Sequence, residues 1–190
     1  MLQKAGIKLK KLGVFLLRDA GKMGFNQQTI SKLTLQGVLL RVGRGVYVHA
    51  DLPVSEEIGF EVACRVLGEN SAIAGLSALY HYRLVEQVPE QIWVVVAANV
   101  RTKDQRYRLM RTGSSLKEEI ILKKGYRIVS VERAILEGLK FSTKIGERVA
   151  LKAARDALAQ KKTTLAKLGQ AASKLGVKYV LTKYFEAIVA

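Results

Sequence analysis

Three short helices are predicted from the spacing of apolar residues in the first 37 positions. Each of the first two carries an apolar stripe and ends at a glycine, and a two-residue extended link joins them. The stripes are Leu2, Ala5, Leu9 and Leu12 before Gly13, then Leu16, Leu17, Ala20 and Met23 before Gly24, with Val14 and Phe15 as the link.

The third helix is predicted from about residue 27 to residue 36. Asn26 precedes it as a good N-cap, because its side-chain oxygen can accept hydrogen bonds from the free N–H groups of the next turn. One face holds Ile30, Leu33 and Gly37 and is expected to pack inward. The opposite face holds polar residues and one leucine, namely Gln28, Ser31, Lys32, Leu35 and Gln36.

Two β-rich runs follow, residues 39–42 and 46–48, around the turn Gly43-Arg44-Gly45. Such runs on either side of a glycine-containing turn are typical of a hairpin. Three helices followed by a hairpin is the order of elements in a winged helix-turn-helix. The third helix would then be the recognition helix, and Arg44 would stand at the tip of the wing.

The rest of the chain mixes helical and strand patterns. Helices are predicted over residues 55–67 and 76–84, and the continuous apolar run 91–97 is typical of a strand covered on both faces. Runs 107–112, 120–123 and 126–129 complete a predicted sheet of four strands. Ser130 caps a helix that extends through residue 139, and three further apolar stripes are expected to face the core. Those stripes are Ile145, Val149, Ala153 and Ala157, then Leu165, Leu168, Ala172 and Leu175, then Val177, Val180, Leu181, Tyr184, Phe185 and Ile188.

These elements predict an α+β protein of two domains. Residues 1–52 form the winged helix-turn-helix, and residues 53–190 form a mixed domain with a small β-sheet and a C-terminal helical bundle. The acidic turn Asp51-Leu52-Pro53 is the predicted boundary, and neither a low-complexity linker nor an internal repeat interrupts the chain. The 49% share of hydrophobic residues and the mean hydropathy of +0.09 are enough for a packed core.

The charge balance points to a polyanionic partner. The chain has 32 Lys and Arg against 16 Asp and Glu, a net charge of +16, which favours nucleic acid or an acidic membrane surface over an inert basic surface. The excess is concentrated in the first fifty residues, where Asp19 is the only acidic residue. The basic residues there are Lys4, Lys8, Lys10, Lys11, Arg18, Lys22, Lys32, Arg41 and Arg44.

The polar face of the predicted third helix fits the major groove of a DNA duplex. Gln28 can pair with adenine N6 and N7, and Lys32 can bind guanine. The helix N-terminus can accept a phosphate oxygen, and Arg44 would reach phosphate or a minor groove with flanking glycines that let the backbone approach. Leu35 on the same face either touches a thymine methyl group or indicates a slightly different helix register. The alternative interpretation of the segment is a protein-docking module, which its charge disfavours.

Cysteine usage and hydropathy predict a cytoplasmic protein. Cys64 is the single cysteine, so the chain forms no internal disulfide, as is usual in a reducing compartment. Neither a signal peptide nor the roughly 18 unbroken apolar residues of a membrane span is apparent.

The search for catalytic chemistry finds no recognisable site. His49, His81 and Cys64 make no plausible metal set, and no serine is framed by a nucleophile signature. A phosphate-binding G-x-x-x-x-G-K-[ST] loop and the [DE]-x-K tripeptide of many nucleases are both absent. We therefore expect neither an enzyme nor a bound cofactor or metal, with an unrecognised nuclease as the weaker alternative.

The ordered set of motifs resembles the AbiEi-type antitoxins of type IV, abortive-infection toxin–antitoxin systems, a family of transcriptional regulators of viral defence. The resemblance covers nearly the whole chain, and its specificity lies in the order of the motifs. They are QTISKL (28–33), LRVGRGVY (40–47), AGLSALY (74–80), VPEQIWV (88–94) and VERAIL (131–136), followed by the helical tail.

The resemblance implies a DNA-binding repressor of its own operon. It also implies that the C-terminal domain opposes a nucleotidyltransferase toxin without forming a stable complex with it. By position, the expected DNA contacts are Asn26, Gln27, Gln28, Thr29, Ser31, Lys32, Arg41 and Arg44. A second basic cluster, which either extends the phosphate track or is a solvated strand edge, comprises Arg101, Lys103, Arg106, Arg108 and Arg111. The alternative function is a non-catalytic module that binds RNA or DNA of any sequence.

Overall fold

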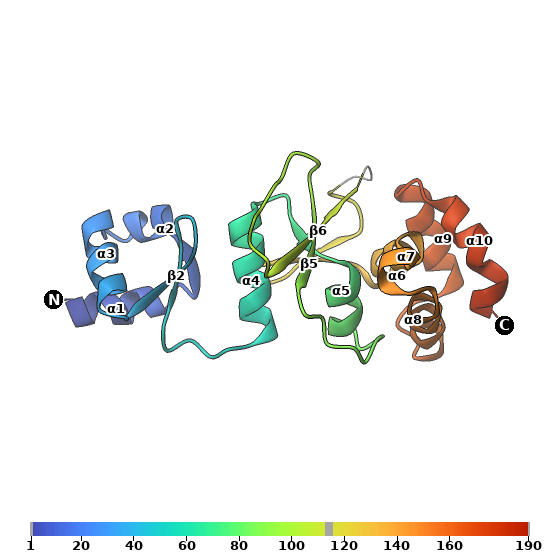
Figure 1. Cartoon of the computed structure of the whole chain (residues 1–190), viewed down its shortest axis with the longest axis horizontal. Helices are drawn as coiled ribbons and strands as arrows, with labels where there is room; N and C mark the ends of the chain where they lie inside the picture. Colours follow the sequence, from blue (N-terminus) through green and yellow to red (C-terminus); the bar gives the residue numbers. More distant parts are fainter. Residues whose placement is uncertain (1, 113–115, 190) are drawn as a thin grey trace. The chain divides into compact units, whose positions relative to one another are not determined.

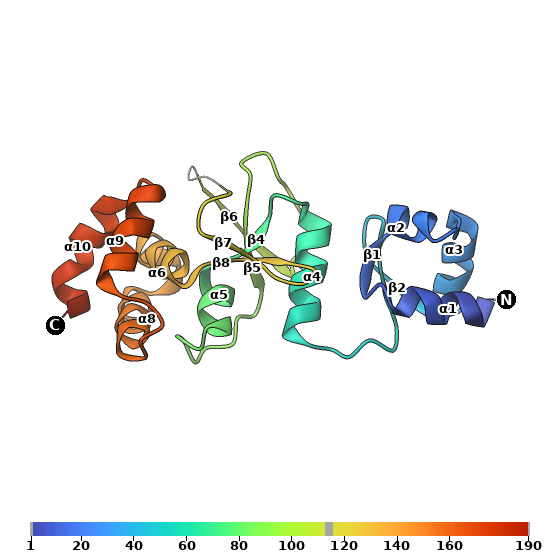
Figure 2. The same ribbon diagram turned by 180° about the vertical axis from the view of Figure 1, so that it is seen from behind.

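The computed structural model describes residues 2–112 and 116–189, without the side chains of residues 2–4, so Leu2 of the first stripe and Lys4 lie outside the described side chains. The fold is α+β, the class that the sequence predicts, and it has two sheets (Figures 1 and 2). The chain forms two compact units, Met1–Glu69 and Asn70–Ala190.

The first unit combines helices with a small antiparallel sheet. Its elements are α1 (Leu2–Lys10), β1 (Val14–Leu16), α2 (Leu17–Lys22), α3 (Gln27–Leu35), β2 (Leu39–Gly43), β3 (Val46–His49) and α4 (Glu56–Leu67). The predicted hairpin is confirmed as β2 and β3. The link at Val14 and Phe15 proves to be a third strand, since β1 pairs with β3 and the strand order is β1-β3-β2.

The two faces of this sheet bury different parts of the unit. Phe15 belongs to the cluster that also contains Ile30 and Leu33 of α3. Val14 belongs to a second cluster, in which Val62 of α4 packs against β1 and β3. Successive side chains of a strand point to opposite faces. Phe15 of β1 therefore packs with α3 on one face of the sheet, and Val14 packs with α4 on the other.

Helix α4 makes the first compact unit longer than the predicted 52 residues. Ser55 caps it by accepting a hydrogen bond from the N–H of Ile58, and Arg65 lies 3.8 Å from Asp19 of α2. The boundary predicted after Leu52 therefore falls inside the compact unit, which extends to Glu69. Whether function divides at the same place stays a prediction.

The second unit contains a mixed sheet in the order β6-β5-β4-β8-β7. The strands are β4 (Ala72–Ile73), β5 (Ile92–Val96), β6 (Tyr107–Arg111), β7 (Ile120–Leu122) and β8 (Arg127–Val129). Four were predicted, and β4 is the addition, a two-residue strand in the centre of the sheet. The β5 residues Val94, Val95 and Val96 are fully buried, which confirms the strand predicted to be covered on both faces.

Helix α5 (Gly75–His81) packs against the sheet through its first residue. Gly75 has φ +51°, and a Cβ added there would lie 2.6 Å from both Trp93 Cε3 and Met110 Sδ. Only glycine fits so close an approach of backbone to side chains.

The C-terminal helices pack on one another, as Figures 1 and 2 show. They are α6 (Val131–Lys140), α7 (Ser142–Ile145), α8 (Glu147–Ala159), α9 (Leu165–Lys174) and α10 (Lys178–Val189). Ser130 caps α6 as predicted, by accepting from the N–H of Arg133. Phe185 was expected in the core, but 45% of it is exposed, because it lines an open hollow between α9 and α10.

A fully buried arginine ties α6 to the segment that leads into β7. Arg133 donates from Nε to Glu137 Oε1 over 2.8 Å and from Nη1 to the carbonyl of Glu118 over 2.6 Å. Burial raises the pKa of Glu137 against the opposing effect of the Arg133 charge. Helical i, i+4 spacing alone does not show whether such a pair is buried, so the sequence did not predict this one.

Candidate nucleic-acid interface

Helix α3 begins and packs as its sequence predicts. The Asn26 side chain accepts a hydrogen bond from the N–H of Thr29, which confirms the N-cap. Ile30 and Leu33 are each 1% exposed and form the inner face. Gly37, which was expected to pack inward with them, is exposed. It follows the helix in a turn with φ +72°, so helical spacing no longer applies to it.

The outer face of α3 is exposed and polar. Gln28, Ser31 and Lys32 are all exposed, and in the described part of the chain their side chains have no hydrogen bond or ion pair within the protein. Gln27 is also exposed and unbound in the same sense. Thr29 differs, because its hydroxyl donates to Asn26 Oδ1 over 2.9 Å. Of the six candidate DNA-contact residues within 26–32, Asn26 and Thr29 are therefore hydrogen-bonded to each other. The other four have polar groups that make no hydrogen bond within the described residues.

The hairpin places two further cations near its turn. Arg44 is exposed and makes no hydrogen bond or ion pair within the described residues. Arg41 is exposed as well, and its Nε donates to the carbonyl of Gly43 over 3.3 Å, which directs the guanidinium along the hairpin toward the turn. A β-bulge between Arg41 and Gly43 accompanies this contact.

The two glycines of the hairpin have reasons within the fold. A Cβ added to Gly43 would lie 2.5 Å from Cγ2 of Val66, so Gly43 lets β2 approach α4. Gly45 has φ +69°, which the tight turn requires and which favours glycine. From the sequence, both glycines were expected to let the backbone approach DNA. The structure gives each an internal role that does not depend on a ligand.

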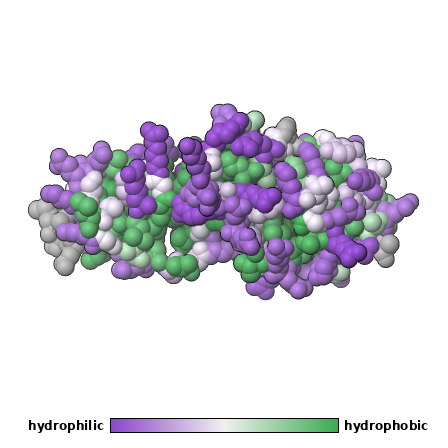
Figure 3. Space-filling view, viewed as in Figure 1, coloured by the Kyte–Doolittle hydropathy of each residue, from purple (hydrophilic) through white to green (hydrophobic). Residues whose placement is uncertain are grey.

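Several cations of the first unit are exposed to solvent, either unpaired or in exposed ion pairs. Two of its ion pairs join exposed groups, Lys10 with Asp51 at 3.6 Å and Arg18 with Glu69 at 2.9 Å. Figure 3 shows strongly hydrophilic side chains projecting from the visible face of this unit, with apolar patches between them. Lys32 and Arg44 remain without an acidic partner among the described residues.

The second basic cluster is exposed, but several of its cations are already engaged. Arg106 binds Asp104 through Nε to Oδ1 at 3.0 Å and Nη2 to Oδ2 at 2.6 Å, and these hydrogen bonds lower the pKa of Asp104. Arg108 lies over the Trp93 ring at 4.5 Å. Arg101 donates to the carbonyl of Val100 over 2.9 Å, and Arg111 to the same carbonyl over 3.3 Å. Lys103 is exposed and unbound within the described chain. Arg106 is therefore the member least suited to bind phosphate, because its charge is offset locally.

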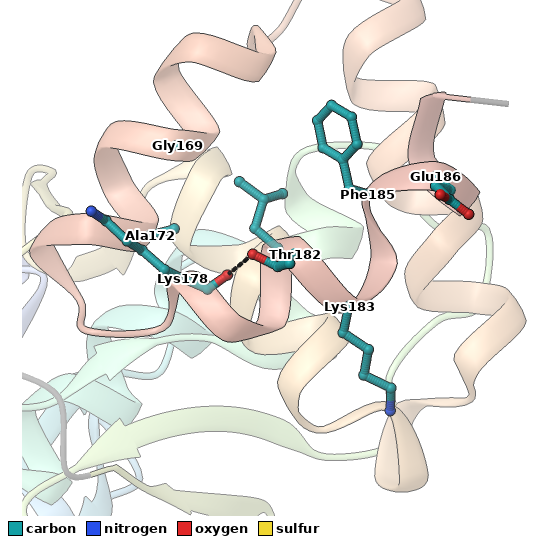
Figure 4. A pocket seen from close by; sticks show the side chains of 8 residues that line it. Gly169, Ala172, Lys178, Thr182, Lys183, Phe185 and Glu186 are labelled. Carbon is teal, nitrogen blue, oxygen red and sulfur yellow. Dashed lines mark hydrogen bonds between the residues drawn. The ribbon is translucent and has the colours of Figure 1, made fainter.

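A hollow of about 670 Å³ lies between α9 and α10 (Figure 4). It is lined by Gly169, Ala172, Lys178, Leu181, Thr182, Lys183, Phe185 and Glu186. The Thr182 hydroxyl donates to the carbonyl of Lys178 over 3.2 Å, so it is engaged within its own helix. The lining holds one carboxylate, of Glu186, and two amines, of Lys178 and Lys183.

Within residues 2–112 and 116–189, no group of three His, Cys, Asp or Glu side chains is placed to hold a metal ion. No helix within the same ranges is both long and apolar enough to cross a membrane.

The fold and the interface together define an α+β protein that presents an exposed polar helix beside a basic hairpin. Residues 9–49 match the family model of the AbiEi antitoxin transcriptional regulators. The resemblance inferred from the motifs is thus confirmed over that segment, which runs from the end of α1 through β3 and contains both α3 and the hairpin. The matched family is one of regulators and antitoxins. No match is found among curated proteins.

Proposed function

We propose that this protein binds a specific sequence of double-stranded DNA through α3 and the β2–β3 hairpin, which act as a winged helix-turn-helix. The observation that carries the proposal is the outer face of α3, where Gln28, Ser31 and Lys32 are exposed and unbound while Ile30 and Leu33 opposite them are buried. Amide, hydroxyl and ammonium groups in that arrangement match the donors and acceptors on base edges in a major groove.

Arg44 and Arg41 would bind the backbone of the same duplex. A guanidinium without an acidic partner at a hairpin turn is suited to phosphate contact, which fixes orientation without reading sequence. The match to a regulator family over residues 9–49 supports DNA over a protein partner for this surface. The second basic cluster of residues 101–111 would add phosphate contacts through Lys103 and Arg101.

In the cell, the DNA would be the promoter of the protein's own operon, and the protein would repress it. We further propose that residues 53–190 counteract a nucleotidyltransferase toxin encoded beside it, without a stable complex, in the cytoplasm. The match to a family of antitoxin regulators over residues 9–49 supports a regulator and antitoxin role. The operon, the toxin class and the role of residues 53–190 are proposed from the wider resemblance of the motifs.

Competition binding on duplex DNA tests the DNA-binding proposal. A duplex from upstream of the gene should bind at least roughly 10³-fold more tightly than a random duplex, and its affinity should fall steeply with salt. Equal affinity for random DNA and structured RNA would instead support a general nucleic-acid-binding module.

A rescue assay tests the antitoxin proposal separately. The triple variant Gln28→Ala, Lys32→Ala and Arg44→Ala, expressed from an independent promoter, should fail to repress a reporter but still rescue cells from the neighbouring toxin. Loss of rescue in a folded triple variant would contradict the division of labour between the two parts of the chain.

A further inference from the structure

Leu35 is the last residue of α3 and is 88% exposed. The sequence analysis left open whether an outward leucine there meant a shifted helix register. The register is correct, because Ile30 and Leu33 are buried as predicted and the cap is at Asn26. Leu35 is therefore exposed because it lies on the outer face of α3, and the predicted register of the helix is correct.

Leu35 shares a helix face with the candidate base-reading residues. Positions 28, 31, 32 and 35 are separated by three, four and seven residues, the spacings that bring side chains together on one face of an α-helix. At 1.5 Å per residue, Leu35 lies about 10 Å along the helix axis from Gln28. That length corresponds to roughly three base-pair steps of about 3.4 Å.

Isolated apolar side chains are common on protein surfaces, so exposure alone says little. The position of this one is informative, because a helix that sets Gln28 against one base pair sets Leu35 over another base pair nearby. A leucine side chain neither donates nor accepts a hydrogen bond. Pressed against a phosphate or a polar base edge, it would desolvate that group without replacing the lost hydrogen bond.

The major groove offers one apolar feature that suits leucine. Thymine carries a C5-methyl group there, and the side-chain contacts known for that methyl group are apolar. 5-Methylcytosine carries a methyl group at the same ring position. We propose that Leu35 reads the C5-methyl group of a pyrimidine in the major groove and is a specificity-determining residue of α3. The proposal rests on the DNA-binding function proposed above and names one chemical group that the surface recognises.

The test begins with a pool of duplexes that contain a random core, from which wild-type protein selects a preferred sequence. The selected duplex is then made with each thymine replaced in turn by uracil, which lacks only the C5-methyl group. Removing one methyl group from an apolar contact should weaken wild-type binding roughly three- to tenfold at one position. Leu35→Ala should bind the thymine duplex more weakly than wild type and lose nothing further when that thymine becomes uracil.

Ile7→Ala is the matched control, since Ile7 is an exposed aliphatic residue of α1 (65% exposed) that lies off the α3 face. It should respond to uracil as wild type does. A second set of duplexes places cytosine or 5-methylcytosine at the sensitive position. Tighter wild-type binding to the methylated base, absent in Leu35→Ala, would show that methylcytosine is read as well. A response to thymine alone would restrict the reading to thymine.

Three outcomes overturn the proposal and are distinguishable. In the first, wild type selects a sequence, but every uracil substitution changes the affinity of wild type and of Leu35→Ala by the same factor. Leu35 then reads no methyl group, and the DNA-binding function stands. If wild type selects no sequence, the proposed function fails and the reading by Leu35 fails with it. A Leu35→Ala variant that binds DNA like wild type but loses self-association in sedimentation would assign the leucine to a protein contact instead.

Discussion

Asn26 Oδ1 accepts two hydrogen bonds from Thr29, one from its backbone N–H and one from its hydroxyl, each over 2.9 Å. This pair closes the first turn of α3, which contains Gln28 and precedes Lys32. Asn26→Ala should therefore destabilise the helix by about 1 kcal/mol, the usual effect of losing an N-cap. Asn26→Asp keeps the acceptor and should stay close to wild type. Amide hydrogen exchange over residues 27–30 measures the effect, and unchanged exchange in Asn26→Ala would show that the cap contributes nothing.

Gln28→Ala and Lys32→Ala should each weaken binding to the selected duplex and reduce the preference over random DNA. The expected loss is about 1–3 kcal/mol for a bidentate base contact. Both side chains are exposed and unbound within the described chain, so the substitutions should leave the fold intact. Gln170→Ala, an exposed glutamine of α9, is the matched control and should not change affinity. Wild-type affinity and specificity in both α3 variants would place the recognition surface elsewhere.

Arg44→Ala should weaken binding to all duplexes alike. Loss of one phosphate contact lowers the slope of log affinity against log salt concentration by about 1. Arg44→Lys retains the charge and should retain most of the slope. Arg18→Ala removes a cation from the same unit that is paired with Glu69 at 2.9 Å, and it should alter the slope less. A change in sequence preference in Arg44→Ala would indicate a base contact instead of a phosphate contact.

Gly75→Ala should destabilise the second unit by about 2 kcal/mol or more, from the strain of a positive φ and from overpacking against Trp93 and Met110. Gly169→Ala is the opposite case. Gly169 lies inside α9, and an added Cβ would meet nothing within 4 Å. Alanine there should stabilise the unit by roughly 0.5–1 kcal/mol through its higher helix propensity. Urea unfolding of the full chain compares the two, and equal midpoints for both variants would contradict the close packing at Gly75.

Tyr82 should make the second unit sensitive to alkali. Burial raises its pKa from 10.0 to about 12, with smaller contributions from Glu132 and Tyr126, and its hydroxyl donates to the carbonyl of Val129 over 2.7 Å. Because the folded state holds this proton more tightly than the unfolded state, the stabilisation is complete below pH 10 and is lost as pH rises toward 12. Tyr82→Phe should remove this component of the pH dependence of unfolding.

The absorbance of tyrosinate follows the same group directly. The difference between the wild-type and Tyr82→Phe titrations should show one tyrosine ionising near pH 12. Tyr179→Phe, which alters an exposed tyrosine of α10, should retain that late step. A difference curve centred near pH 10 would contradict the burial of the Tyr82 hydroxyl.

Local patterns predicted the secondary structure of residues 26–49 well. The Asn26 cap and the inner face of Ile30 and Leu33 depend on residues within a few positions of one another, so the sequence contains the whole signal. The hairpin was predicted for the same reason, because the strands are joined by a short glycine turn. The match to a regulator family over residues 9–49 coincides with this locally determined segment.

Elements that depend on distant partners were missed or misplaced. Strand β1 is three residues long and β4 is two, and each is a strand only because a partner far along the chain pairs with it. The extension of the first unit to Glu69 and the need for glycine at position 43 both follow from α4 packing on the hairpin. Apolar spacing could not show that Phe185 is exposed, since that depends on where α8 and α9 lie against α10.

The sequence by itself thus determined the limits of α3, its cap, its two faces and the basic hairpin beside it, because short-range hydrogen bonding and helical periodicity are encoded within a few residues. Only the tertiary structure decided which cations stay free of partners and that Arg133 is fully buried, with its Nη1 bound to the carbonyl of Glu118. Those properties arise from contacts between segments distant in sequence, and the folded chain alone brings such segments together.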